Sequence, residues 1–206
     1  GAWAVLLLLL AFGEARIAAV GDIGVVEGVW LRLVQGNIPQ NLKWRRELVD
    51  KHLAAQIRLG AAPAVPRPTH VLWSEAAAPL FLAEDAARLA QIGAGTPPGG
   101  LTLLGTLRTT PPDAPRFQVW NSMLAVDDTG AVVDWYDKSH LVPFGEFMPL
   151  GSVLGLGSIA GGMTDFSQGR GVHTLHLPGL PPVGPLICYE VIFPGAVVDP
   201  DDRPQW

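Results

Sequence analysis

The sequence predicts an α/β domain in which sheets are covered by helices, preceded by an apolar helical segment. Short β-prone runs alternate with stretches of helical spacing, and later runs follow one another as hairpins. Residues 1–13 carry no charge. Hydrophobic residues make up 49% of the chain and charged residues 16%, which is too apolar for a disordered protein. A single sheet covered by helices and two sheets packed together both fit this order of strands and helices.

The composition excludes several classes of function. At 206 residues the chain is one large domain or little more. Its net charge of -5 argues against a nucleic-acid surface. Cys188 is the single cysteine, so the chain has no intrachain disulfide and no multi-cysteine zinc site. His173 and His176 are three apart on an expected strand and would face opposite sides. We therefore expect no metal and no cofactor.

The apolar start is shorter than a membrane crossing, which needs about 20 residues. The first ionisable side chain is Glu14. We predict that residues 1–13 are the end of a transmembrane helix whose beginning lies outside the chain, and that 14–29 form a linker. A buried core helix is the alternative.

The first half of the chain predicts two strand–helix units. Alternation at 29–34 and a β-prone run at 71–73 indicate strands. Helical spacing follows each strand, first from Asn41 to the proline-rich segment 63–68, then after Pro79. The positions that carry these two patterns are Leu42, Val49, Leu53 and Ile57, and then Leu82, Ala86, Leu89 and Ala90.

The second half predicts strands and one long loop. Asp127, Asp128, Thr129 and Gly130 separate two alternating runs and indicate a hairpin. Residues 138–171 are rich in Gly and Pro and longer than a usual connection, which is typical of a functional loop. The expected strands are 101–107, 117–126, 131–136, 172–177 and 183–187.

Three side chains at the ends of expected strands could carry chemistry. Cys188 could be a nucleophile with backbone N–H groups beside it, or a small core residue. Glu75 could accept the thiol proton, or be a solvated or helix N-terminal carboxylate. Lys138 could neutralise an oxyanion, oriented by Glu146, or be a surface lysine. Together they supply the parts of acyl transfer.

Three segments resemble the nitrilase superfamily and, within it, the apolipoprotein N-acyltransferase family. They are VQGNIPQNLKW at 34–44, YDKSHLVPFGEFMPL at 136–150 and ICYEVIFP at 187–194. The resemblance implies an incomplete nitrilase-like α-β-β-α sandwich, with residues 30–206 as the N-terminal part of the catalytic domain. Residues 73–76, Trp-Ser-Glu-Ala, depart from the family pattern around the Glu.

The resemblance implies a mechanism. Glu75 would be the general base, and Cys188 would take a fatty acyl chain from a phospholipid as a thioester. Lys138 would stabilise the oxyanion. The acceptor would be the N-terminal amine of an apolipoprotein's S-diacylglyceryl cysteine. Glu146, Tyr189, Glu190 and Trp44 would be supporting residues.

The resemblance also implies a place for the enzyme. We expect a monomer in the bacterial inner membrane, with its catalytic domain on the periplasmic side, and no turnover from this fragment alone. The loop 138–171 would be an apolar lid that meets lipid, through Phe144, Phe147, Met148, Leu150, Leu154 and Leu156, or else a surface loop packed on itself. A soluble amidase that hydrolyses a C–N bond and a non-catalytic membrane-associated scaffold are the alternatives.

Overall fold

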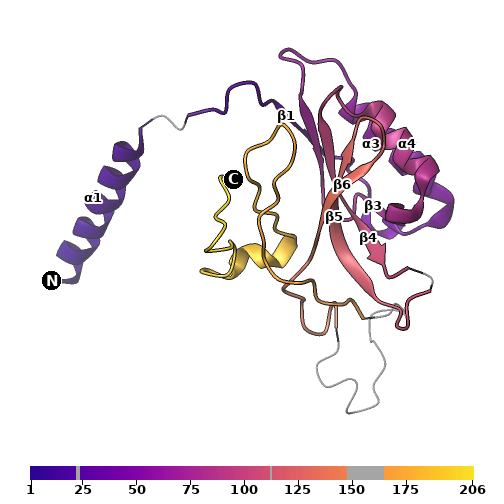
Figure 1. The fold of residues 1–206 in the computed structure, drawn as a ribbon. Helices are drawn as coiled ribbons and strands as arrows, with labels where there is room; N and C mark the ends of the chain where they lie inside the picture. Colours follow the sequence, from indigo (N-terminus) through magenta and orange to yellow (C-terminus); the bar gives the residue numbers. More distant parts are fainter. Residues whose placement is uncertain (22–23, 112, 148–164) are drawn as a thin grey trace, which may run out of the picture.

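The computed structural model describes residues 1–21, 24–111, 113–147 and 165–206. They form an N-terminal helix and a separate α/β unit (Figure 1). The elements are α1 (Ala2–Val20), β1 (Leu31–Val34), α2 (Gln40–Lys43), η1 (Arg46–Leu48), α3 (Val49–Gly60), β2 (His70–Trp73), β3 (Ala78–Phe81), η2 (Leu82–Glu84), α4 (Ala86–Gly95), β4 (Leu101–Thr109), β5 (Val119–Asp127), β6 (Val132–Asp137) and η3 (Cys188–Ile192).

The described strands form one mixed sheet in the order β1-β2-β4-β5-β6, with β3 beside β4. β1, β2 and β4 are parallel, and β4, β5 and β6 form an antiparallel meander. β6 therefore runs in the same direction as β2 and β4. The chain leaves these three strands at one edge of the sheet, which is where ligand sites of α/β folds lie.

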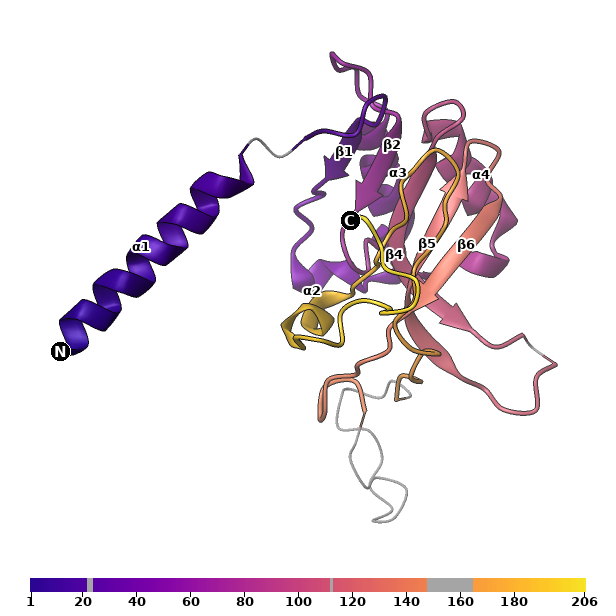
Figure 2. The ribbon, with the colours of Figure 1, turned by 60° about the vertical axis from the view of Figure 1, so that its left-hand side comes forward.

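Two layers cover the sheet. The helices α3 and α4 lie on one face, and residues 172–187 lie on the other (Figures 1 and 2). Leu53 of α3 and Ile92 of α4 pack on Leu104 and Leu124. On the second face Leu175 belongs to the cluster that includes Tyr136. Burial of apolar side chains on both faces stabilises the sheet.

The hairpin and five strands are confirmed. β5 and β6 pair across the turn at 127–130, where the Gly130 N–H donates to Asp127 O. The predicted strands at 172–177 and 183–187 are wrong, because these segments meet only at a Leu175–Val183 bridge. Prolines at 178, 181, 182 and 185 lack the N–H that a longer ladder needs.

The first predicted helix is divided in two, and the second begins later than the spacing suggested. Arg45 has extended backbone, which separates α2 from α3, so Leu42 and Val49 belong to different helices. Pro79 itself lies in β3, which pairs with β4, and the short helix η2 follows before α4. α4 begins at Ala86, because the Asp85 carboxylate accepts from the Arg88 N–H as an N-cap.

The helix α1 continues past the predicted boundary at residue 13, through Glu14 and Arg16 to Val20. None of its residues is buried, and it stands clear of the sheet in Figures 1 and 2. Among the described helices, α1 has the length and composition to cross a membrane, as signal sequences and some core helices also do.

Candidate active site

Glu75 and Lys138 lie at the same edge of the sheet and are linked through Asn121 and Glu146. Asn121 Nδ2 donates to Glu75 Oε1 at 2.8 Å and lies 3.5 Å from Glu146 Oε1. Lys138 Nζ donates to the same Glu146 oxygen at 2.8 Å. The Lys138 side chain is only 1% exposed, so this ion pair is buried at its cationic end. The predicted pairing of Lys138 with Glu146 is therefore present. We call these four residues the Glu75–Lys138 network.

The loop that carries Glu75 is pressed against β4. Ala76 has a positive φ of 46°, which a non-glycine residue rarely adopts. A Cβ on Gly105 would lie 2.7 Å from Glu75 Cα and 2.5 Å from the Ala76 N. Lys43 Nζ donates to Glu75 O at 3.0 Å from the other side. The position of the carboxylate thus depends on close backbone packing.

Cys188 begins the short helix η3, and its thiol is exposed. The sequence placed it at the end of a strand. The structure instead places it after extended backbone at Ile187, with a left-handed φ of 54°. Strained backbone of this kind is concentrated at functional sites. The sharp turn presents the sulfur to solvent rather than to the core.

Glu190 joins the segment of Cys188 to that of Lys138. Its buried Oε1 accepts from Tyr136 OH at 2.8 Å, Ser139 N at 2.7 Å, Ser139 Oγ at 2.8 Å and His140 N at 3.0 Å. Its Oε2 accepts from Ile187 N at 2.8 Å. We call these residues the Glu190 cluster. The donors come from both segments, which the carboxylate therefore holds side by side.

The charge on Glu190 is maintained by these donors. Burial alone would raise the pKa of Glu190, but hydrogen bonds from the Ile187 and His140 N–H groups and from Ser139 lower it below its ordinary value. Burial also raises the pKa of Tyr136, so its hydroxyl remains a donor. The cluster is thus a charged acceptor surrounded by neutral donors, the stronger kind of hydrogen bond.

The other two predicted supporting residues, Tyr189 and Trp44, belong neither to the network nor to the Glu190 cluster. Tyr189 is 42% exposed, and its ring meets the edge of Phe193 at 5.4 Å between centroids. Trp44 follows Lys43, whose ammonium contacts the Glu75 loop. It lines an open cavity of about 530 Å³ with Leu80 and Phe81. Trp44 therefore lies beside the Glu75 loop and outside the network.

The structure describes the two ends of the predicted lid, residues 138–147 and 165–171. Phe144 is 70% exposed, and its N–H donates to Phe147 O at 2.8 Å. Glu146 Oε2 accepts from Val142 N at 2.9 Å, which fixes the carboxylate that faces Lys138. Met148, Leu150, Leu154 and Leu156 lie outside the described residues.

Asn121 was missed by the sequence reasoning. It bridges the two carboxylates, and its Oδ1 is buried without a protein partner. The available signal was an amide inside the predicted strand 117–126, because a buried polar side chain requires a hydrogen-bonding partner. No group of three or more His, Cys, Asp or Glu side chains that could hold a metal occurs within the described part of the chain.

Comparison with known proteins identifies the family. The family model described as Carbon-nitrogen hydrolase matches residues 36–201. The chain belongs to the carbon-nitrogen hydrolase family. The matched range of this carbon-nitrogen hydrolase includes Glu75, Lys138 and Cys188.

Curated relatives of this carbon-nitrogen hydrolase share one name, apolipoprotein N-acyltransferase. The chain is 37% identical to that of Bradyrhizobium diazoefficiens, covering 98% of this chain and 40% of the relative. It is 39% identical to that of Allorhizobium ampelinum, covering 92% and 37%. The resemblance read from three segments is confirmed. The chain spans about two fifths of the length of these relatives.

A solved structure supports the fold. The carbon-nitrogen hydrolase from Helicobacter pylori G27 matches with a TM-score of 0.54 at 13% identity. The match covers 82% of this chain and 54% of that protein. The predicted nitrilase-like α/β class is thus confirmed, with the mixed sheet described above.

Proposed function

We propose that this chain supplies the catalytic residues of an apolipoprotein N-acyltransferase. Such an enzyme moves a fatty acyl chain from a phospholipid to the N-terminal amine of a diacylglyceryl-modified apolipoprotein. The observation that carries the proposal is the Glu75–Lys138 network, which the Glu190 cluster joins to the segment of Cys188. The names of the relatives support the same reaction.

In the first half-reaction Glu75 accepts the thiol proton of Cys188 as the sulfur attacks the ester carbonyl carbon of a phospholipid. A C–S bond forms and the ester C–O bond breaks. Glu75 then returns the proton to the departing lysophospholipid oxygen. The Lys138 ammonium, held by Glu146, and the Tyr189 N–H stabilise the negative oxygen of the tetrahedral intermediate.

In the second half-reaction the amine of the diacylglyceryl cysteine attacks the thioester carbonyl. A C–N bond forms, the C–S bond breaks, and Glu75 transfers a proton from the amine to the departing thiolate of Cys188. The enzyme returns to its starting state after a ping-pong cycle. Attack by water would release a free fatty acid, so exclusion of water decides between transferase and hydrolase.

The membrane setting belongs to the same proposal. α1 has the length and composition to anchor the catalytic domain to a bilayer. We place that domain on the periplasmic side of the bacterial inner membrane, as a monomer that draws its acyl donor from the bilayer. Trp44, Tyr189 and the exposed Phe144 would meet the lipid substrates.

The test uses the full-length protein in phospholipid vesicles with a diacylated lipopeptide, and mass spectrometry of the products. We expect N-acylated peptide, and its loss in Cys188→Ala and Lys138→Ala. Lys51→Ala, at an exposed lysine, is the matched control. Free fatty acid without N-acylated peptide would instead indicate a hydrolase. Unchanged transfer in both site variants would refute the assignment of Cys188 and Lys138 as catalytic residues.

A further inference from the structure

We propose that Arg108 and Asp137 are positioning residues that hold Lys138 in place from the opposite face of the sheet. Neither belongs to the Glu75–Lys138 network or to the Glu190 cluster. The kinetic part of this inference rests on the proposed function, whereas its structural part does not.

Arg108 and Asp137 form a bidentate ion pair between β4 and β6. Arg108 Nε donates to Asp137 Oδ1 at 2.9 Å, and Arg108 Nη2 donates to Asp137 Oδ2 at 3.0 Å. Ser122 Oγ of β5 donates to Asp137 Oδ1 at 2.6 Å. The two side chains are 20% and 13% exposed. Paired geometry and partial burial distinguish this contact from an ordinary surface salt bridge. We call the three residues the Arg108 clamp.

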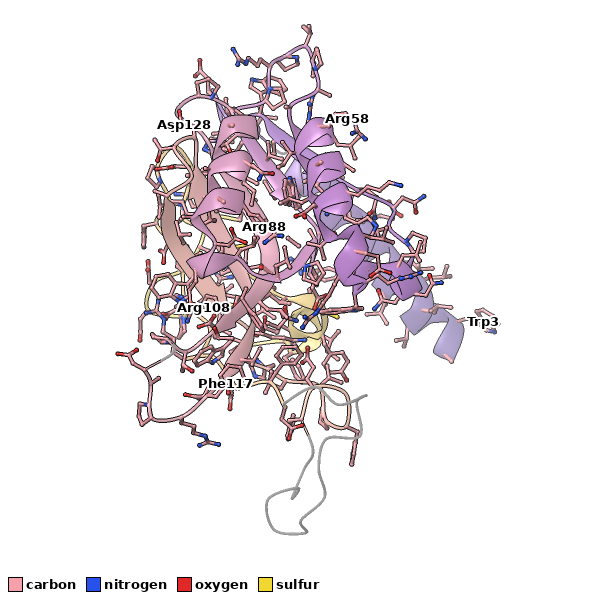
Figure 3. All side chains as sticks on the ribbon, turned by 90° about the vertical axis from the view of Figure 1, so that its right-hand side faces the viewer. Trp3, Arg58, Arg88, Arg108, Phe117 and Asp128 are labelled. Atoms are coloured by element: carbon pink, nitrogen blue, oxygen red, sulfur yellow. The ribbon has the colours of Figure 1, made fainter. Side chains whose placement is uncertain are left out.

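Two tryptophans hold the guanidinium in place. Its central carbon lies 4.7 Å from the ring centroid of Trp135 and 5.3 Å from that of Trp120. Arg108 lies four residues after Leu104, which packs with the α3 and α4 side chains, so strand alternation puts Arg108 on the helix-bearing face. Figure 3 views the molecule from this side and shows Arg108 below α4. The aromatic contacts fix the plane of the guanidinium and hence of the ion pair.

On β5 and at the end of β6, the clamp residues are directly next to network residues in the sequence. Ser122 and Asp137 are paired in the β5–β6 register. The residues beside them, Asn121 and Lys138, belong to the network. Because successive residues of a strand face opposite sides of the sheet, the clamp lies on one face and the network lies on the other.

The backbone at this point is held from both directions. Lys138 N donates to Asn121 O at 2.9 Å, and Gly169 N donates to Lys138 O at 2.8 Å. A Cβ on Gly169 would lie 2.1 Å from Asp137 O, so a glycine is required there. With the Lys138 N–H and C=O groups both hydrogen-bonded, the end of β6 can still rotate about the strand axis. The Arg108 clamp removes that freedom through the Asp137 side chain.

The position of Lys138 makes this support necessary. Lys138 follows the last residue of β6, which has one neighbouring strand in the described sheet, β5. Strand ends at a sheet edge fray easily, yet the Lys138 ammonium must stay 2.8 Å from Glu146. A displacement of about 1 Å at a catalytic group can reduce a rate by about 100-fold.

The first experiment reads the position of Lys138 without any assay of activity. The full-length protein, as wild type, Arg108→Gln and Asp137→Asn, is pulsed with acetic anhydride, and lysine acetylation is measured by mass spectrometry. Lys138 is 1% exposed, and the exposed Lys51 is the internal reference. We expect Lys138 to be protected in the wild type and labelled several-fold faster in both variants. Equal protection in the variants would overturn the inference.

The second experiment measures acyl transfer, with Arg116→Gln as the control at an exposed arginine outside the clamp. We expect kcat to fall about 10-fold to 100-fold in Arg108→Gln and Asp137→Asn with KM unchanged, and to remain at the wild-type value in the control. An unchanged kcat, or a rise in KM alone, would contradict the inference. If Arg108→Gln does not fold, Asp137→Asn decides, because it preserves the shape of the side chain. A wild type without transfer activity would refute the proposed function, and the labelling would still decide on the clamp.

Discussion

The Glu190 carboxylate accepts a hydrogen bond from the backbone N–H of Ser139 at 2.7 Å, across 51 residues of sequence. Ser139 directly follows Lys138, and Glu190 lies two residues after Cys188. The same carboxylate also accepts from the Ile187 N–H, which precedes Cys188. One buried anion therefore fixes the spacing of the proposed nucleophile and the proposed oxyanion-stabilising cation.

Glu190→Gln should weaken both the fold and the reaction. A glutamine amide has one acceptor oxygen and brings an NH₂ group toward N–H and O–H donors, so buried donors lose their partners. We expect the free energy of unfolding to fall by roughly 2–3 kcal/mol. Acyl transfer should fall about 100-fold, because the two segments are no longer held in register. Urea unfolding and the lipopeptide assay measure the two effects. A variant with wild-type stability would contradict this role for Glu190.

The same residue predicts an acid sensitivity. The pKa of Glu190 is below its ordinary value of 4.5, so its ionised form stabilises the folded state. This contribution is present above the ordinary value and is lost as the pH falls through the lowered pKa of the folded state. We expect the free energy of unfolding of the wild type to fall below pH 4.5 more steeply than that of Glu190→Gln. Parallel pH curves for the two proteins would show that Glu190 contributes nothing to this dependence.

Lys138→Met should separate catalysis from folding. Methionine fills a similar volume and needs no partner, and Glu146 is 15% exposed, so it can be hydrated. We expect a folded protein in which acyl transfer is reduced about 100-fold to 1,000-fold, the effect of removing one oxyanion donor. Melting curves and product analysis check the two expectations.

Glu146→Gln is the complementary change. It leaves the buried Lys138 ammonium without its carboxylate, and breaking a buried ion pair from one side costs about 3–5 kcal/mol. We expect a lower melting temperature for Glu146→Gln than for Lys138→Met. The reverse order would mean that the ion pair does not support the fold.

Local patterns predicted most of the sheet and were sufficient to select the candidate site residues. The alternation in β4, β5 and β6 and the turn at Asp127–Gly130 were sufficient to predict the meander. Glu75, Lys138 and Cys188 could be selected because each follows a β-prone run. The contacts of Glu190 could not be predicted, because its donors are more than 45 residues away in sequence, apart from Ile187.

Tertiary contacts decided the elements that were predicted wrongly. The segment Ala78–Phe81 contains a proline and continues into apolar helical spacing, and only the neighbouring β4 makes it a strand. The segments before Cys188 have strand-like alternation, but their prolines limit them to one bridge. Asn121 gave a local signal, whereas its two carboxylate neighbours come from other parts of the chain.

Gly105→Ala tests whether the Glu75 loop depends on its packing against β4. Gly105 lies inside a strand, where glycine is unfavourable unless another backbone approaches closely. An added Cβ would lie 2.5 Å from the Ala76 N and 2.7 Å from Glu75 Cα, closer than van der Waals contact allows, so the loop must move. Movement would lengthen the 2.8 Å hydrogen bond between Asn121 and Glu75. We expect acyl transfer to fall about 100-fold.

The matched control is Gly24→Ala, since a Cβ at Gly24 would meet no atom within 4 Å. This variant should transfer acyl chains at the wild-type rate. Asn121→Leu removes the same hydrogen bond without moving the loop, so its turnover should fall as far as that of Gly105→Ala. The Asn121→Leu protein should also be less stable than the wild type. If Gly105→Ala keeps full activity, the loop has room to adjust, and the close packing under Glu75 is structural rather than catalytic. If Asn121→Leu is active and Gly105→Ala is not, catalysis depends on the position of the loop but not on its hydrogen bond to Asn121. Measuring kcat for the three variants beside the wild type therefore separates the position of the carboxylate from its hydrogen bond.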